Sequence, residues 1–482
     1  MLVYSLRIAV LSFLLLSTNA LLAQKNTWDL QTCIDYALKN NLQLQQNSLN
    51  IARAQSNLSA AKEAFYPNLN ASSSLGSNFG RSIDPFTNTF VNKRIESVNT
   101  SIGANMTLYN GGTVRQTIQQ NSVDLSTEQA NLQRAQNDLM LNVASAFLLV
   151  LQNTELLNNA KLQIVGVKEQ IDRTEKLIKA GALAESAIFT LNSQLATNEV
   201  QIVNAENGLM LAKIQLKQLL QMPANEVLEI AVPILPDVDV NAVLMNTDEI
   251  YAAAESTLPQ IKAADLGIKS SAIGIKLAQA NRLPVITFGA NAFTGYSSAQ
   301  NKFFEGDGTK TTVELPVGYL GSDPTQLVFK QQEIPNGKIV DFGFGRQFKE
   351  SFRHNYGLSL QVPIYNRGQV RNATRQAQIR LSASEINAKI VRNQLRQTIE
   401  QAYADARAAQ ASFTANTRRY EVLKQSYDMT EKSLALGRAN ASEFNLAKNN
   451  LDIAQNELIR AKYDYIFRLK VLDFYMGKPL SL

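Results

Sequence analysis

Two long segments of the chain carry apolar residues at intervals of seven. The first runs from Val143 to Ile178, and the second, 256 residues later, from Ile399 to Leu434. In the first segment another row lies four residues earlier, so a narrow apolar stripe follows one helix for about five heptads. The repeated positions are Val143, Val150, Leu157, Ile164, Ile171, Ile178 and Ile399, Ala406, Phe413, Tyr420, Tyr427, Leu434. The pattern predicts a long coiled-coil helix that occurs twice.

Each long helix is expected to turn back on itself. Gly181 interrupts the first apolar pattern and Gly437 the second, and a new seven-residue pattern follows each glycine. The sequence therefore predicts helical hairpins over residues 112–222 and 367–477. The first helix of each hairpin has nearly 70 residues, which gives a length of about 100 Å.

Four other segments alternate apolar and small polar residues with a period of two. They cover residues 68–80, 97–109, 285–297 and 352–365. Each is at least as long as the roughly 9–11 residues that a tilted membrane strand needs. One such strand fits a half-buried soluble sheet equally well. Four of them in an exported chain favour a water-filled barrel that is apolar outside and polar inside.

The chain is built from two copies of one unit. Helices over 28–65 reappear over 247–281 at an offset of 217, whereas the hairpins repeat at an offset of 256. We expect repeats at 24–245 and 246–482, with residues 223–245 linking them.

The two offsets differ by 39 residues, which must be inserted between the third and fourth strands. The inserted segment lies within residues 297–350 and is rich in glycine, proline, aspartate and aromatic residues. We expect it to be a long external loop, as is typical of outer-membrane barrels; its conformation does not follow from the sequence.

Residues 1–23 have the pattern of a secretory signal peptide. Arg7 precedes an apolar core, and small residues precede a cleavage site that we place after Ala23. Cys33 lies too far from that site for lipid attachment and is expected to be a buried helix residue. No later stretch of 18 apolar residues occurs, so we expect strands, not a helix, to cross the membrane.

The composition argues against nucleic-acid binding, metal binding and catalysis. The chain has 47 basic and 41 acidic residues, one cysteine and one histidine. Its one local basic cluster, Arg418-Arg419, is expected to be a solvated helix face. A Cys/His metal site cannot be assembled from these residues, and Gly111-Gly112 lacks the lysine of a phosphate-binding loop. We therefore expect no enzyme activity, no cofactor and no nucleic-acid partner.

A sheet exposed to lipid must close, because an open edge leaves backbone groups unpaired in hydrocarbon. Four strands cannot close, since the smallest single-chain barrels have eight. Two chains would give eight strands with a filled interior, and three would give twelve with room for a bore. The polar strand faces and the two hairpins per chain favour a homotrimer, in which a helical tube continues the barrel. A tube about 100 Å long extends far beyond a bilayer of about 30 Å.

The chain resembles the TolC-like outer-membrane efflux protein family over residues 28–479. Three motifs carry the resemblance: Trp28 to Asn41, Tyr66-Pro67 before the first strand, and Val362 to Gly368 before the second long helix. The resemblance implies an α+β membrane protein with a trimeric 12-stranded β-barrel, four strands per chain, continued by an α-helical periplasmic barrel. It implies a passive exit duct in the outer membrane of a Gram-negative cell. Its partners would be outer-membrane lipid, a periplasmic adaptor (membrane fusion) protein and an inner-membrane transporter.

The same resemblance places adaptor contacts at the turns of the two hairpins. The positions are Ala180, Gly181, Ala182, Leu183, Leu436, Gly437, Arg438 and Ala439. Both glycines also fit plain helix C-caps. Family members close at this end, sometimes with acidic rings; the acids near the turns here are Glu421, Asp428, Glu431 and Glu443. Such charges are more often solvated.

A coiled-coil structural or adhesive surface protein is the main alternative. It accounts for the heptads, but not for four alternating strands or for a repeat that contains both helix and strand. Within the duct hypothesis, the sequence does not separate drug efflux from protein secretion, which would be the type I system.

Overall fold

The computed structural model describes residues 27–83, 89–92, 94–181, 183–233 and 246–480 and has mixed helix and sheet. The expected signal peptide and much of the expected linker lie outside these residues. The chain forms two compact units, and each combines parts of both sequence repeats. The helical unit comprises the described residues within 1–56, 122–272 and 379–482, and the strand-bearing unit those within 57–121 and 273–378. The repeats are therefore a pattern of sequence and element order, not two separate domains.

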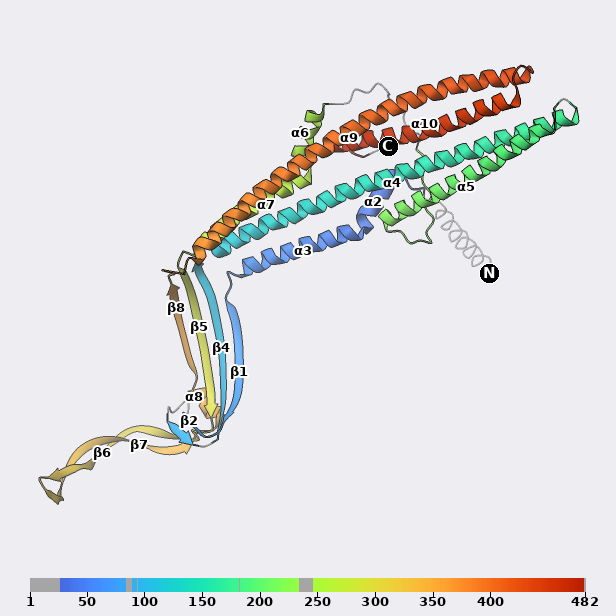
Figure 1. Ribbon diagram of the computed structural model, residues 1–482. Helices are drawn as coiled ribbons and strands as arrows, with labels where there is room; N and C mark the ends of the chain where they lie inside the picture. The colour runs from blue at the N-terminus through green and yellow to red at the C-terminus, as the bar shows by residue number, and fades with distance from the viewer. Residues whose placement is uncertain (1–26, 84–88, 93, 182, 234–245, 481–482) are drawn as a thin grey trace, which may run out of the picture. The chain divides into compact units, whose positions relative to one another are not determined.

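Eight helices form four pairs of equal length. The lengths are 11, 22, 67 and 35 residues in both repeats. The first repeat has α2 (Leu30–Asn40), α3 (Leu42–Glu63), α4 (Thr113–Lys179) and α5 (Ser186–Leu220); the second has α6 (Thr247–Thr257), α7 (Pro259–Ala280), α9 (Gln369–Ala435) and α10 (Ala441–Tyr475). Figure 1 shows α4 with α5 and α9 with α10 as long antiparallel hairpins.

The segment 28–65 contains two helices because Asn41 ends one and begins the next. The Asn41 N–H donates to the Ala37 carbonyl, and its Oδ1 accepts from the N–H groups of Gln43 at 2.9 Å and Leu44 at 3.2 Å. Asp29 begins α2 in the same way by accepting from the Thr32 N–H at 2.8 Å. The side-chain and backbone hydrogen bonds from Thr32 lower the pKa of Asp29 below its ordinary value of 3.8. Short polar side chains satisfy the free donors of both helix starts.

Four strands form one antiparallel sheet in the order β1-β4-β5-β8 (Figure 1). They are β1 (Asn68–Asn78), β4 (Ile95–Asn110), β5 (Val285–Ser297) and β8 (Arg353–Gln361). The last strand ends four residues before the predicted limit of 365. Among the described residues β1 pairs only with β4 and β8 only with β5, so no described strand pairs with either outer edge of the sheet.

The inserted segment, whose conformation the sequence left open, forms a β-hairpin and a short helix. Strands β6 (Lys302–Leu320) and β7 (Asp323–Asp341) pair antiparallel, and α8 (Phe344–Glu350) follows them. Buried Gln347 accepts from the Ser297 N–H at 2.8 Å and donates to the carbonyls of Ser297 and Phe342. One amide thus fastens the base of the hairpin to the end of β5. A smaller hairpin pairs β2 (Arg81–Ile83) with β3 (Phe90–Asn92).

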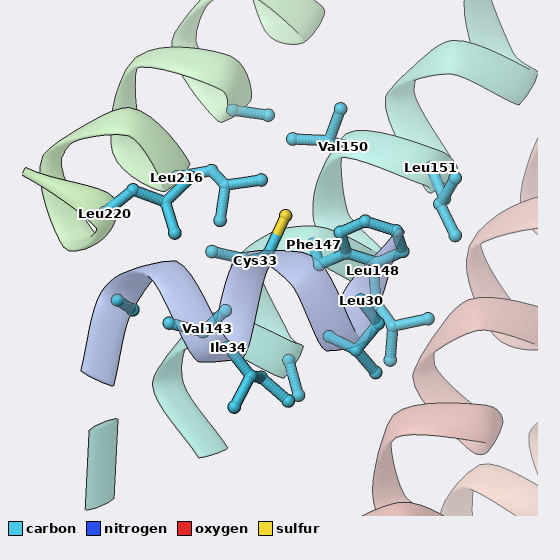
Figure 2. Packing of buried hydrophobic residues seen from close by; sticks show 14 of the residues in the cluster. Leu30, Cys33, Ile34, Val143, Phe147, Leu148, Val150, Leu151, Leu216 and Leu220 are labelled. Carbon is cyan, nitrogen blue, oxygen red and sulfur yellow. The ribbon is translucent and has the colours of Figure 1, made fainter. Parts of the chain in front are cut away.

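The core of the helical unit lies where α2 packs against α4 and α5. Figure 2 shows Cys33 and Ile34 among Val143, Phe147 and Leu216. Desolvation, helped by the Asp29 charge, raises the pKa of the Cys33 thiol to about 12. The expectation of a buried Cys33 is confirmed.

A second core forms at the corresponding positions of the second repeat. Three pairs related by the two offsets are at most 1% exposed: Cys33 and Ile250, Ala37 and Ala254, Val143 and Ile399. The seven-residue stripes are thus buried at Val143 and Ile399, far from the turns of the hairpins. Towards the turns they are only half-buried in the single chain, as at Ile171 and Tyr420.

Among the described residues, α4 alone contains a segment apolar enough to cross a membrane, by length and composition. Of that segment, 44% is buried within the chain. Its apolar character has a packing explanation, because Val143, Phe147 and Leu151 of the same helix belong to the core.

Candidate functional site

The turn of the first hairpin is an exposed helix end capped by glycine. Gly181 has φ +70°, and its N–H donates to the Ile178 carbonyl at 2.9 Å, as in a left-handed C-cap. Ala180 and Leu183 are exposed, the latter by 40%. Ala182 lies outside the described residues. A Cβ placed on Gly181 would meet no atom within 4 Å, so crowding does not explain the glycine. The positive φ does, because residues with a side chain rarely adopt it.

The turn of the second hairpin has the complete form of the same cap. Gly437 has φ +69° and donates to the Leu434 carbonyl at 3.0 Å, while Arg438 donates to that of Ser433 at 2.8 Å. Leu436 is 69% exposed, Arg438 is exposed and Ala439 is half-buried. Both turns therefore present a leucine and small residues to solvent, with the backbone fixed by hydrogen bonds.

The four acids considered for a closing ring have different surroundings. Glu443 forms a capping box with Asn440 at the start of α10, which gives it a structural role. Glu421 and Glu431 are exposed, and Asp428 is half-buried. The four acids thus differ in exposure and in contacts, and their role in closure stays a prediction.

A polar cluster that the sequence did not single out lies between α9 and α10. The Tyr427 ring lies 5.3 Å from that of Phe444 and 6.0 Å from the Lys448 Nζ. Desolvation, then the charges of Glu431 and other nearby acids, raises the Tyr427 pKa to about 12. Lys448 is paired with Asp452, which is only 7% exposed. The sequence feature that could have indicated this cluster is the spacing of four between Lys448 and Asp452, with Asp452 on the packed face of a helix.

Desolvation raises the pKa of Asp452 above 3.8, and Lys448 opposes the shift only in part. Burial of this carboxylate costs desolvation free energy, and loss of the lysine that pairs with it would leave a buried charge uncompensated.

The strands present one apolar and one polar face. On the apolar face of the outer strands, Leu75 is 81%, Tyr356 is 78% and Leu358 is 69% exposed in the single chain. On the polar face, asparagines of the two central strands lie over glycines: a Cβ on Gly103 would lie 2.7 Å from the Asn291 Oδ1. Large apolar side chains exposed together on one face mark a surface that contacts lipid or protein.

The described residues hold no group of three or more His, Cys, Asp or Glu side chains placed to bind a metal ion.

Comparisons with known proteins agree on one family. The family model described as "Outer membrane efflux protein" matches residues 33–221 and 250–478. The outer membrane protein TolC of Escherichia coli is 24% identical over 340 residues, which cover 69% of this chain and 60% of TolC. This chain is thus matched to less than two thirds of the length of TolC.

Two further proteins match almost the whole chain. The outer membrane efflux protein BepC of Brucella suis is 20% identical over 437 residues, covering 89% of this chain and 81% of BepC. The crystal structure of VceC, an outer membrane protein of Vibrio cholerae, superimposes with a TM-score of 0.69 at 14% identity, covering 94% of this chain and 97% of VceC. At that identity the likeness establishes the fold.

Proposed function

Because the chain belongs to the outer membrane efflux protein family, we propose that it is the passive exit duct of a tripartite efflux or type I secretion system. The family match over both repeats places the protein in the outer membrane. The observation that carries the duct is the sheet of four strands with polar and apolar faces and two unpaired edges. Such a sheet is stable in lipid only when other chains close it.

Three copies supply twelve strands, enough for a barrel with a bore. The polar face, with its glycines and asparagines, then lines the water-filled interior, and Leu75, Tyr356 and Leu358 face lipid. Each trimer contributes six long hairpins, which continue the barrel as a helical tube on the periplasmic side.

The exposed turns at Gly181 and Gly437 are the proposed contacts with a periplasmic adaptor. Leu183 and Leu436 supply apolar contact area, and the small residues beside them let another helical hairpin approach closely. An inner-membrane transporter, joined through the adaptor, selects the cargo and provides energy. The duct itself performs no chemistry.

Glu421, Asp428, Glu431 and Glu443 remain candidates for lining a closed periplasmic end. The Tyr427–Lys448–Asp452 cluster lies on the same hairpin, so a change in the packing of α9 against α10 would alter its burial. Opening must move these helices past their neighbours.

Deletion and complementation in the source cell test this function. Loss of the protein should abolish export by one transporter–adaptor pair, and that pair should copurify with the protein. A surface protein of the coiled-coil adhesive type would leave export intact and would purify without either partner.

A further inference from the structure

We propose that β8 of one copy pairs with β1 of the next copy in the register that joins β4 to β5 within one chain. Gln361 then lies opposite Ser72, Ser359 opposite Ser74 and Leu358 opposite Leu75 of the neighbouring copy. The inference rests on the proposed shared barrel and specifies the interface that closes it.

The two repeats contain the same strand pair in the same register. In the first repeat Asn68 lies opposite Asn105, and in the second Val285 lies opposite Gln361. Adding the offset of 217 to the first strand and of 256 to the second converts one pair into the other. The offsets found in the sequence therefore describe the backbone pairing residue by residue.

The β4–β5 pair joins the first repeat to the second. Along it Asn105 lies opposite Gly289, Gly103 opposite Asn291 and Ile102 opposite Ala292. In a closed ring the second repeat of one copy lies beside the first repeat of the next, which is the same succession of repeats as in the β4–β5 pair. Applying the same offsets to the β4–β5 partners gives the three pairs stated above.

The faces of the strands agree with this register. Ser359 and Ser74 both lie on the polar face, whereas Leu358 and Leu75 both lie on the apolar face. A slip of one residue would bring the polar face of one strand against the apolar face of the other. Only registers that differ by an even number of residues keep the barrel amphipathic.

The exposure of the residues after β8, and the early end of β8 itself, indicate that the β8 edge of the sheet lacks a neighbouring strand in the single chain. Leu108 and Tyr109 at the end of β4 are 51% and 43% exposed, while their counterparts Ile364 and Tyr365 are 95% and 85% exposed. Beyond Asn105 it is β5 alone that pairs with β4, which continues to Asn110. The corresponding residues after Gln361 have no such partner, and β8 ends there. A neighbouring β1 would extend β8 towards Asn366.

The seams differ at their helical end. A Cβ on Gly111 would lie 2.5 Å from the Ala280 carbonyl oxygen, whereas the counterpart of Gly111 is Arg367, with φ +52°. The counterpart of Ala280 is Glu63 of the neighbouring copy. The seam between copies must therefore be wider here, and it sets a cationic side chain beside an acidic one.

Disulfide trapping in the full-length protein tests the register. Ser359→Cys with Ser74→Cys places two thiols on opposed residues, whose Cβ atoms in antiparallel strands lie about 4.5–5.5 Å apart. Oxidation of purified protein with copper phenanthroline should link most chains into covalent dimers and trimers on non-reducing gels. Leu358→Cys with Leu75→Cys tests the same register from the apolar face. The native Cys33 is fully buried with a raised pKa, so it gives no background.

The matched control is Ser359→Cys with Ser72→Cys, which stays on the polar face but shifts the pair by two residues. Its thiols belong to diagonal neighbours about 7–8 Å apart, too far for a disulfide. Trimers in which the control links, while both opposed pairs do not, would overturn the register and leave the shared barrel standing. A protein that is monomeric by light scattering in detergent, with no linkage in any variant, would overturn both.

Discussion

The two hairpin turns allow contact with a partner to be separated from folding. Gly437→Glu puts a charged side chain into the second turn, where a Cβ meets no atom within 4 Å, so no clash arises. The cost is confined to the backbone: φ is +69°, and a residue with a side chain pays about 1–2 kcal/mol in this conformation. Folded proteins have about 5–15 kcal/mol of stability. Trimers should therefore form normally, while export should be lost because the turn no longer fits the adaptor.

Two comparisons identify the cause of that loss. Gly437→Ala pays the same backbone cost without bulk or charge and should lose much less export than Gly437→Glu. Gly166→Glu adds the same charge within α4, where a Cβ also meets no atom within 4 Å. Replacing a glycine inside a helix raises the stability by about 0.5–1 kcal/mol. This variant should therefore export normally.

The assay is export of the cargo from cells in which the variants are matched for trimer content. Normal export by Gly437→Glu would refute adaptor contact at this turn. An equal loss in Gly437→Ala and Gly437→Glu would assign the effect to backbone strain instead.

Three further predictions concern single buried side chains. Burial raises the pKa of Asp452, so protonation of this carboxyl favours the folded state. Its contribution to the free energy of unfolding should therefore fall as the pH rises from 3.8 through the folded pKa. Denaturation curves of Asp452→Asn should lack that pH dependence. An unchanged pH dependence would show that Lys448 already compensates the carboxylate. Phe147→Ala should cost about 3–5 kcal/mol of unfolding free energy, because Phe147 is 1% exposed. A cost within about 0.5 kcal/mol, as for a surface substitution, would contradict the core described. Cys33 should react with a maleimide only after denaturation, and labelling of the native protein would contradict its burial.

Periodic patterns predicted the parts of the fold that depend on spacing alone. The stripe that includes Val143 and Ile399 identified the long helices, and the alternation around Leu75 and Leu358 identified strands of the sheet. The offsets of 217 and 256, read from the sequence, proved to govern strand register as well. These features repeat over many residues, so a single exception does not obscure them.

Features set by one side chain or by tertiary contact were missed. The double role of Asn41 between α2 and α3 needs only two hydrogen bonds and leaves the apolar spacing almost unchanged. The sequence left the conformation of the β6–β7 segment open, because charges, glycine and proline interrupt its alternation. Its base is held by Gln347, which bonds to Ser297 fifty residues earlier. The Tyr427–Asp452 cluster arises only when α10 folds back on α9.

The central claim is that several copies share one barrel and that the barrel conducts. Light scattering of the full-length protein in detergent, followed by planar-bilayer recording of the same preparation, tests it most directly. We expect particles of three chains that conduct ions weakly, because the proposed closure at the helical end would narrow the duct when no adaptor is bound. A monodisperse monomer without a strand signal in circular dichroism, and without conductance, would contradict it.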